Sequence, residues 1–173
     1  MEQQSVDSIL STFFAFSCAG KQTPTRARYL RVALQLRRYL EAEGAGILCA
    51  QDKALLALER TLEPEAAFAR LFGAHELAYA LSGFLAPEWL LPDLQDRRTQ
   101  VALTPRLIQW LCNSCLLDPR RDRPAIRSAQ AAAAEARKGP ARKGPPEKGP
   151  ADKGPAEEGP LRPGPEPGDS PGG

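Results

Sequence analysis

The first apolar residues of the chain recur at the spacing of a helix. Polar side chains fill the positions between them, and Ser5 is placed to cap the first turn. Gly20 and Pro24 end the pattern. It predicts an amphipathic N-terminal helix over residues 6–16, whose apolar face carries Val6, Ile9, Leu10, Phe13 and Phe16.

A second helix, predicted over residues 24–43, combines apolar and basic side chains. Thr23 followed by Pro24 is a helix-start signal in which threonine is the N-cap, and Gly44 ends the helix. On a helical wheel one stripe is apolar and consists of Tyr29, Val32, Ala33, Leu36, Tyr39 and Leu40. The opposite face holds Arg28, Arg31, Gln35 and Arg38, whereas Arg26 and Arg37 flank the stripe near Leu30.

Three further helices complete the predicted fold. A third covers about residues 48–62, and its stripe is Leu48, Leu55, Leu58 and Leu62; a fourth covers residues 65–85. Residues 93–100 are polar and are predicted to form a loop. Thr104-Pro105 then starts a fifth helix that is apolar on nearly all sides. The patterns predict an all-α fold, a small bundle of about five helices over residues 1–118.

The composition changes after Asp118. Residues 119–136 form a charged hinge and a short alanine-rich helix, which has no stripe of larger apolar side chains and is therefore predicted to dock weakly. Residues 137–173 contain the repeat KGPAR, KGPPE, KGPAD, KGPAE. Frequent glycine and proline prevent a packed core, so a disordered tail is predicted there.

Charge and targeting signals narrow the function classes. The formal net charge is only +2, which does not indicate nucleic-acid binding by the whole chain. The N-terminus carries Glu2 and Asp7 where a secretory signal would be basic, and the uncharged runs are shorter than the roughly 18–20 residues of a membrane span. These observations predict a cytoplasmic chain whose four cysteines are reduced.

Few residues suggest a catalytic or metal-binding site. Cys112 and Cys115 have the spacing of a metal-binding pair, but the other candidate ligands stand singly along the chain, so these are interpreted as core thiols rather than a zinc site. His75 is the single histidine, and no nucleophile elbow, P-loop or dinucleotide motif occurs. The sequence therefore predicts a protein that is not an enzyme and uses no metal, cofactor or small-molecule substrate.

The basic helix at residues 24–43 is open to two interpretations. Its arginines form either a solvated helix face or the polar side of an interfacial helix that meets anionic headgroups while the apolar stripe enters the acyl boundary. Nucleic-acid binding fits less well, because the basic stripe is short.

Two stretches of the sequence resemble the N-terminal half of the peroxin-11 family of peroxisome-proliferation proteins. The first, RARYLRVALQLRRYLEA, matches the family's early basic amphipathic segment through Arg26, Arg28 and Arg31. The second matches its leucine-glutamate helix and Arg-Leu-Gly-like turn through Leu58, Glu59, Leu62, Arg70, Leu71, Phe72 and Gly73. The resemblance covers about residues 5–85; the glycine-proline tail stands where the family has a membrane-embedded region.

The resemblance implies a non-enzymatic membrane-remodelling protein that is peripheral on the peroxisomal membrane and binds its anionic surface. The alternative is a soluble, all-helical adaptor whose apolar helices pack on a partner protein, and a homo-oligomer is left open. Either function is predicted to use Arg26, Arg28, Tyr29, Arg31, Leu36, Arg37, Arg38, Tyr39 and Leu40.

Overall fold

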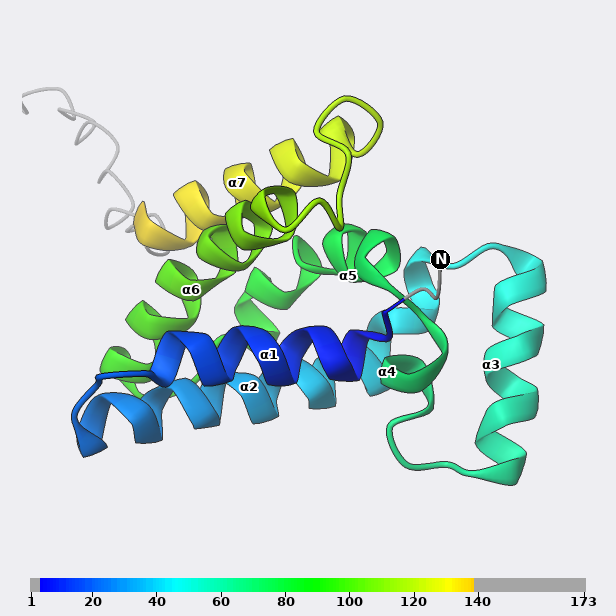
Figure 1. Ribbon diagram of the computed structural model, residues 1–173, viewed down its shortest axis with the longest axis horizontal. Coiled ribbons are helices and arrows are strands. Elements are labelled where there is room, and N and C mark those ends of the chain that lie inside the picture. The colour runs from blue at the N-terminus through cyan, green and yellow to red at the C-terminus, as the bar shows by residue number, and fades with distance from the viewer. Residues whose placement is uncertain (1–3, 139–173) are drawn as a thin grey trace, which may run out of the picture. The chain divides into compact units, whose positions relative to one another are not determined.

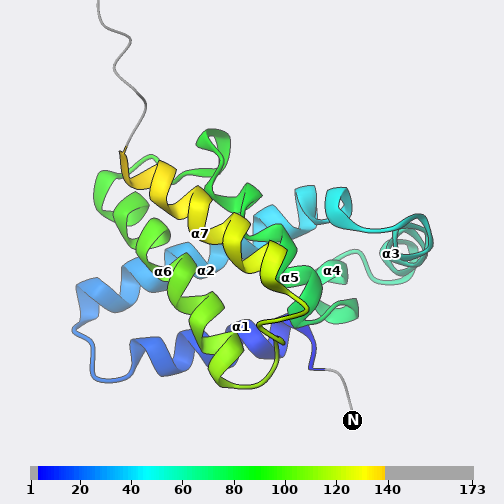
Figure 2. The ribbon, with the colours of Figure 1, turned by 90° about the horizontal axis from the view of Figure 1, so that it is seen from above.

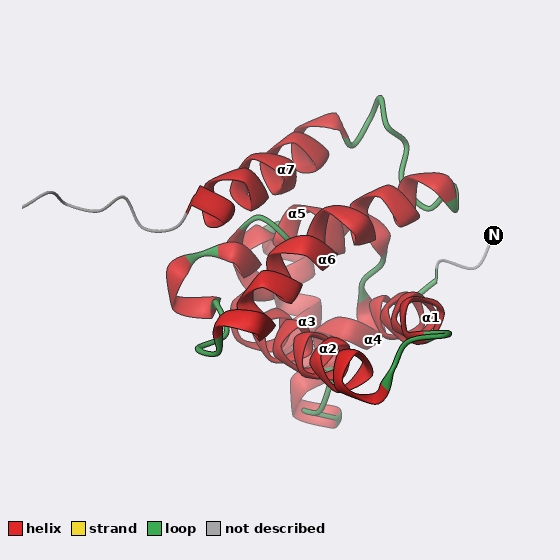
Figure 3. Ribbon diagram, turned by 90° about the vertical axis from the view of Figure 1, so that its left-hand side faces the viewer, coloured by secondary structure: helices red, strands yellow, loops and turns green. Residues whose placement is uncertain are grey.

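The computed structural model describes residues 4–138, and these residues form helices joined by loops (Figures 1 and 3). The prediction of an all-α fold is confirmed for this part of the chain, which contains no strand. It holds seven α-helices rather than about five. They are α1 (Val6–Cys18), α2 (Thr23–Glu43), α3 (Ala50–Leu62), α4 (Ala67–Leu71), α5 (Ala74–Ala80), α6 (Leu94–Asn113) and α7 (Arg123–Lys138). Short 3-10 turns lie at Gly44–Ile47 (η1), Gly83–Leu85 (η2) and Pro87–Trp89 (η3).

Helices α1 and α2 form a hairpin whose two arms lie side by side (Figure 1). The Ser5 hydroxyl accepts a hydrogen bond from the backbone N–H of Ser8, as its capping position predicts. Gly20 adopts a φ of 67° in the turn, a conformation that glycine reaches without a Cβ clash. On α1, Phe14 rather than the predicted Phe16 is buried, and Phe16 is 70 % exposed.

Helix α2 is the central element of the bundle, with α1, α4, α6 and η1 packed around it. It begins at Thr23, so Gln22 rather than Thr23 is the N-cap. The Tyr39 hydroxyl donates a hydrogen bond to the Ala80 carbonyl oxygen over 2.9 Å, and burial raises the pKa of this phenol. Gly83 lies against the same hydroxyl, where an added Cβ would approach the oxygen to 2.3 Å.

The predicted fourth helix is divided into α4, α5 and η2. Its first break is at Phe72 and Gly73, where both residues have extended backbone conformations. The Glu76 carboxylate accepts a hydrogen bond from the Gly73 N–H over 3.1 Å, which stabilises the start of α5. The break also frees the Phe72 carbonyl oxygen to accept a hydrogen bond from the Val6 N–H over 2.8 Å, joining α1 to this segment.

Helix α6 begins well before Thr104, so the prediction of a loop over residues 93–100 is wrong. The Asp93 carboxylate caps the helix by accepting hydrogen bonds from the backbone N–H groups of Gln95 and Asp96, each 2.9 Å long. Gln100 is fully buried and bonds the backbone of η2 and of the segment that follows η3. The polar residues of this segment therefore serve as internal hydrogen-bond partners, and Pro105 lies inside the helix instead of starting it.

Helix α7 packs along α6 and α5, which corrects the prediction that the alanine-rich segment docks weakly (Figure 2). Ala125, Ala129 and Ala133 are buried and recur every fourth residue. Small side chains at this spacing allow two helices to approach closely, so alanine alone makes a sufficient contact face. The helical unit extends through Lys138, beyond the predicted boundary at residue 118. The repeat tail predicted for residues 137–173 lies outside the described residues from position 139 onward.

Helix α3 stands at the edge of the bundle in Figures 1 and 2, and its chief neighbour is α4. Leu56 is its buried residue. Leu55, Leu58 and Leu62, which the heptad-like pattern assigns to the contact face, are 47 %, 59 % and 75 % exposed. That prediction is wrong, because the side of α3 that meets the bundle is attached by charged residues as well as by Leu56. One of these is Glu59, whose carboxylate pairs with Arg70 of α4 over 2.8 Å.

Candidate functional site

The apolar stripe of α2 faces the protein core. Tyr29, Leu36, Tyr39 and Leu40 are each at most 9 % exposed and pack with residues of α1, α5 and α6. The predicted membrane- or partner-binding residues therefore fall into two sets. The apolar set is enclosed by neighbouring helices, while the arginines lie at or near the surface.

Two of these arginines form ion pairs within the fold. Arg31 binds Asp96 of α6 through two hydrogen bonds, with Nε to Oδ2 at 2.6 Å and a terminal nitrogen to Oδ1 at 2.7 Å. This contact holds the pKa of the Asp96 carboxyl below its ordinary value. Arg37 donates to Asp7 at 2.9 Å and to Ser11 at 3.1 Å, both on α1. These two arginines thus fasten α2 to α6 and to α1.

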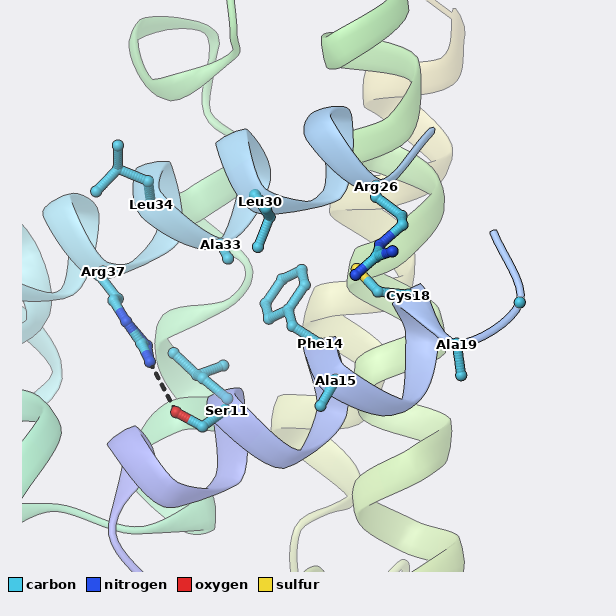
Figure 4. Close-up of a pocket in the computed structure, with 12 residues that line it drawn as sticks. Ser11, Phe14, Ala15, Cys18, Ala19, Arg26, Leu30, Ala33, Leu34 and Arg37 are labelled. Carbon is cyan, nitrogen blue, oxygen red and sulfur yellow. Dashed lines mark hydrogen bonds between the residues drawn. The ribbon is translucent and has the colours of Figure 1, made fainter. Parts of the chain in front are cut away.

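A groove of about 710 Å³ runs between α1 and α2, beside the buried stripe (Figure 4). Leu30 and Leu34 of α2 form one wall and remain 60 % and 50 % exposed. Phe14, Ala15 and Cys18 of α1 contribute to the other wall. The groove is therefore apolar along its length and accessible from outside.

Each end of the groove carries an arginine. Figure 4 shows Arg26 beside Cys18 at one end and Arg37 bonded to Ser11 at the other. The two positions on α2 are separated by about 16 Å at 1.5 Å per residue. Arg37 has one buried guanidinium nitrogen, Nη1, without a hydrogen-bond partner among the described residues. This nitrogen is enclosed by the fold, whereas the other terminal nitrogen, Nη2, contacts Asp7 and Ser11.

The cysteines and the histidine do not assemble a reactive centre in the part of the chain that the structure describes. All four cysteines are free, and burial raises the pKa of the Cys112 thiol. His75 contacts Asp122 over 2.7 Å, and Asp122 also accepts a hydrogen bond from the backbone N–H of Asp118. This arrangement joins α5 to the start of α7. Residues 4–138 contain no group of three histidine, cysteine or acidic side chains that could hold a metal ion.

The sequence pattern did not identify Leu30 and Leu34 as site residues. A wheel assigns each residue to one stripe or to the opposite face, and these leucines lie beside the stripe rather than in it. Their spacing of four residues, next to Arg26 and Arg37, was the available signal. The groove itself needs the second wall from α1, which α2 alone does not reveal.

Among the helices of residues 4–138, none combines the length and the apolar character required to cross a bilayer. Comparisons of the chain with family models, curated proteins and solved structures found no match. The resemblance to the peroxin-11 family therefore stays a prediction from the residues.

Proposed function

We propose that this chain is a non-enzymatic adaptor whose groove between α1 and α2 holds a helix of a partner protein. The bound helix has an apolar face and carries acidic residues. The observation that carries the proposal is the groove itself, an open apolar surface with an arginine at each end. Exposed leucines that line a concavity lose unfavourable contact with water when a partner covers them.

The shape and the charges of the groove both select a helix. Two adjacent helices present ridges between which a third helix packs, and an amphipathic helix in a groove is a recurrent mode of recognition. Arg26 and Arg37 would meet carboxylates about 16 Å apart on the partner, which corresponds to about three helical turns. Charge complementarity at the two ends would set the register and direction of the bound helix.

Membrane remodelling is less compatible with this geometry. Shallow insertion was predicted to use Tyr29, Leu36, Tyr39 and Leu40, whose side chains are in the core. They would reach a bilayer only if α2 left its position between α1 and α6. Such a rearrangement would also separate Arg31 from Asp96 and expose the rest of the core.

A thiol-protection experiment tests the adaptor proposal with the full chain. The probe is an amphipathic peptide of about 18 residues, with a leucine face and two glutamates spaced about three turns apart. Cys18 lines the groove, whereas Cys115 is exposed at the end of α6. We expect the peptide to slow alkylation of Cys18 and leave alkylation of Cys115 unchanged. A peptide with lysines in place of the glutamates should protect Cys18 less.

Two matched variants test whether protection of Cys18 depends on the groove or on any exposed leucine. Leu34→Glu removes an exposed leucine of the groove, and Leu58→Glu removes one of α3. We expect the first variant to lose protection and the second to keep it. Equal protection in the two variants, or none in the unmodified chain, would overturn the proposal. Co-sedimentation of the unmodified chain, without peptide, with phosphatidylglycerol vesicles, which present no phosphate monoester, would instead support membrane remodelling.

A further inference from the structure

A second concave site lies between α2 and α6, and it is polar. It has a volume of about 250 Å³. Its lining consists of Arg28, Arg98, Arg106, Thr25, Tyr29, Gln95, Thr99, Ala102 and Leu103. Three arginine side chains therefore border one hollow, together with residues that carry hydroxyl and amide groups. No carboxylate lines it.

These three arginines differ from others in the fold. Arg31, Arg37, Arg60 and Arg70 each form an ion pair with a carboxylate. Arg28, Arg98 and Arg106 have no ion-pair partner within residues 4–138. Like charges gathered in one depression repel each other and do not stabilise the fold by themselves.

The acidic groups near the hollow are already engaged. Asp96 lies in the same part of α6, but its two carboxylate oxygens bind Arg31. Asp93 caps α6 through the backbone N–H groups of Gln95 and Asp96. Arg28 is near enough to Asp96 to help lower the pKa of its carboxyl, but neither carboxylate forms an ion pair with the three arginines of the hollow.

One of the arginines is positioned by a hydrogen bond. Arg106 donates to the Tyr29 hydroxyl over 3.3 Å, and the Tyr29 ring is itself fixed by burial. Arg28 belongs to the same helix as Tyr29, and Arg98 lies two turns before Arg106 on α6. The site is thus built on two packed helices rather than on a loop, which favours a pre-organised set of donors.

We infer that this arginine site binds a phosphate monoester dianion. Planar guanidinium groups match phosphate oxygens with paired, charge-assisted hydrogen bonds, and several arginines can share one dianion. The threonine hydroxyls supply further donors. This inference does not depend on the α1–α2 groove, because the arginine site lies on the part of α2 that faces α6.

The test measures thermal unfolding of the full chain with and without inorganic phosphate. A ligand that binds the folded state raises the unfolding temperature, so we expect a concentration-dependent increase. The double variant Arg28→Gln/Arg98→Gln should bind phosphate roughly tenfold more weakly or worse, because two charged hydrogen-bond donors are lost. The control Arg120→Gln/Arg121→Gln removes the same charge from an exposed loop and should keep the increase.

Co-sedimentation with lipid vesicles distinguishes a lipid headgroup from free phosphate as the source of the bound phosphate. Vesicles containing phosphatidic acid present a phosphate monoester, and vesicles containing phosphatidylglycerol present a phosphodiester. Selective co-sedimentation with phosphatidic acid that is lost in Arg28→Gln/Arg98→Gln identifies a headgroup source, while binding of inorganic phosphate alone identifies a free one. Binding should strengthen as the pH rises through the range in which the phosphate probe loses its second proton and becomes a dianion.

Two outcomes would overturn the inference. One is the absence of any effect of phosphate and of both vesicle types on the unmodified chain. The other is an equal decrease in the two double variants, which would reveal a non-specific charge effect. Circular dichroism of both variants checks that they remain folded, as expected for substitutions of surface side chains.

Discussion

Helices α2 and α3 follow each other in the chain, yet the leucines of their predicted apolar stripes occupy opposite environments. Leu36 and Leu40 of α2 are at most 2 % exposed, whereas Leu58 and Leu62 of α3 are 59 % and 75 % exposed. Elements on several sides enclose α2, while the chief neighbour of α3 is α4. An apolar stripe is therefore buried only where enough neighbouring elements surround it.

The two helices are also attached by different kinds of contact. Helix α2 contributes a continuous apolar stripe to the core, supplemented by the ion pair of Arg31 with Asp96. Helix α3 relies more on polar contacts: Arg60 bonds the Glu41 backbone carbonyl, and Glu59 pairs with Arg70. Partly exposed ion pairs contribute little to stability, so we expect α3 to unfold locally before α2.

The largest difference is expected from truncating a leucine in each helix. Leu40→Ala on α2 should lower the free energy of unfolding by about 2–5 kcal/mol, because it leaves a cavity in the core. Leu58→Ala on α3 should change it by only about 0.5 kcal/mol. Urea denaturation of the two variants measures both values. Similar losses of unfolding free energy would show that α3 is covered in solution and would contradict the expected difference between the two helices.

A smaller difference is expected at the junction between the two helices. A Cβ at Gly44 would come within 2.6 Å of the Phe68 ring, whereas at Gly46 it would meet nothing within 4 Å. Gly44→Ala should therefore destabilise the fold by about 1–3 kcal/mol through overpacking. Gly46→Ala should be neutral or stabilise by up to about 1 kcal/mol, since it restricts the unfolded chain. Thermal unfolding distinguishes them, and a harmless Gly44→Ala would refute tight packing at the end of α2.

The ion pair that attaches α2 to α6 should make stability depend on pH. Arg31 lowers the pKa of the Asp96 carboxyl in the folded state, so the unfolded chain binds this proton more readily. The resulting stabilisation is complete above the unfolded pKa of about 3.9 and is lost as the pH falls through the lower folded pKa. Between about pH 5 and pH 2 the unfolding temperature of the unmodified chain should therefore decrease more than that of Asp96→Asn. Parallel curves for the two proteins would exclude this role of Asp96.

The smallest effect is expected at the exposed end of α3. Leu62→Gln should leave the free energy of unfolding within about 0.5 kcal/mol of its original value, because Leu62 has little contact to lose. Guanidinium denaturation provides the value, with Leu56→Gln as the matched control at the buried position of the same helix. Leu56→Gln should be clearly destabilising, since it places an amide in the core. Equal changes in the free energy of unfolding for the two variants would mean that the faces of α3 carrying Leu56 and Leu62 do not differ in burial.

Local patterns were sufficient to place some helices and insufficient for others. The cap at Ser5 and the proline at position 24 placed the beginnings of α1 and α2 within about one residue. Local patterns failed for α6. Asp96 and Gln100 of this helix are buried polar residues whose hydrogen-bond partners come from distant segments. Local patterns also missed the docking of α7, because the fit of Ala125, Ala129 and Ala133 depends on the surface they meet.

The candidate sites depended still more on tertiary structure. The helical pattern of α2 predicted Arg26, Arg28 and Arg37 as site residues, and these line the two concave sites. It could not separate the arginine site from the groove, because the former needs Arg98 and Arg106 from α6 and the latter needs a wall from α1. It also assigned Tyr39 and Leu40 to a binding surface, and these residues pack in the core.

By itself the sequence determined that the fold would be all-α and that α2 would carry a continuous apolar stripe beside its arginines. Both properties arise from interactions between residues a few positions apart. Tertiary structure decided that the stripe of α2 is buried and that Leu55, Leu58 and Leu62 of α3 are exposed. The physical reason is that burial depends on the number of helices packed around a face, and a wheel contains no information about neighbours.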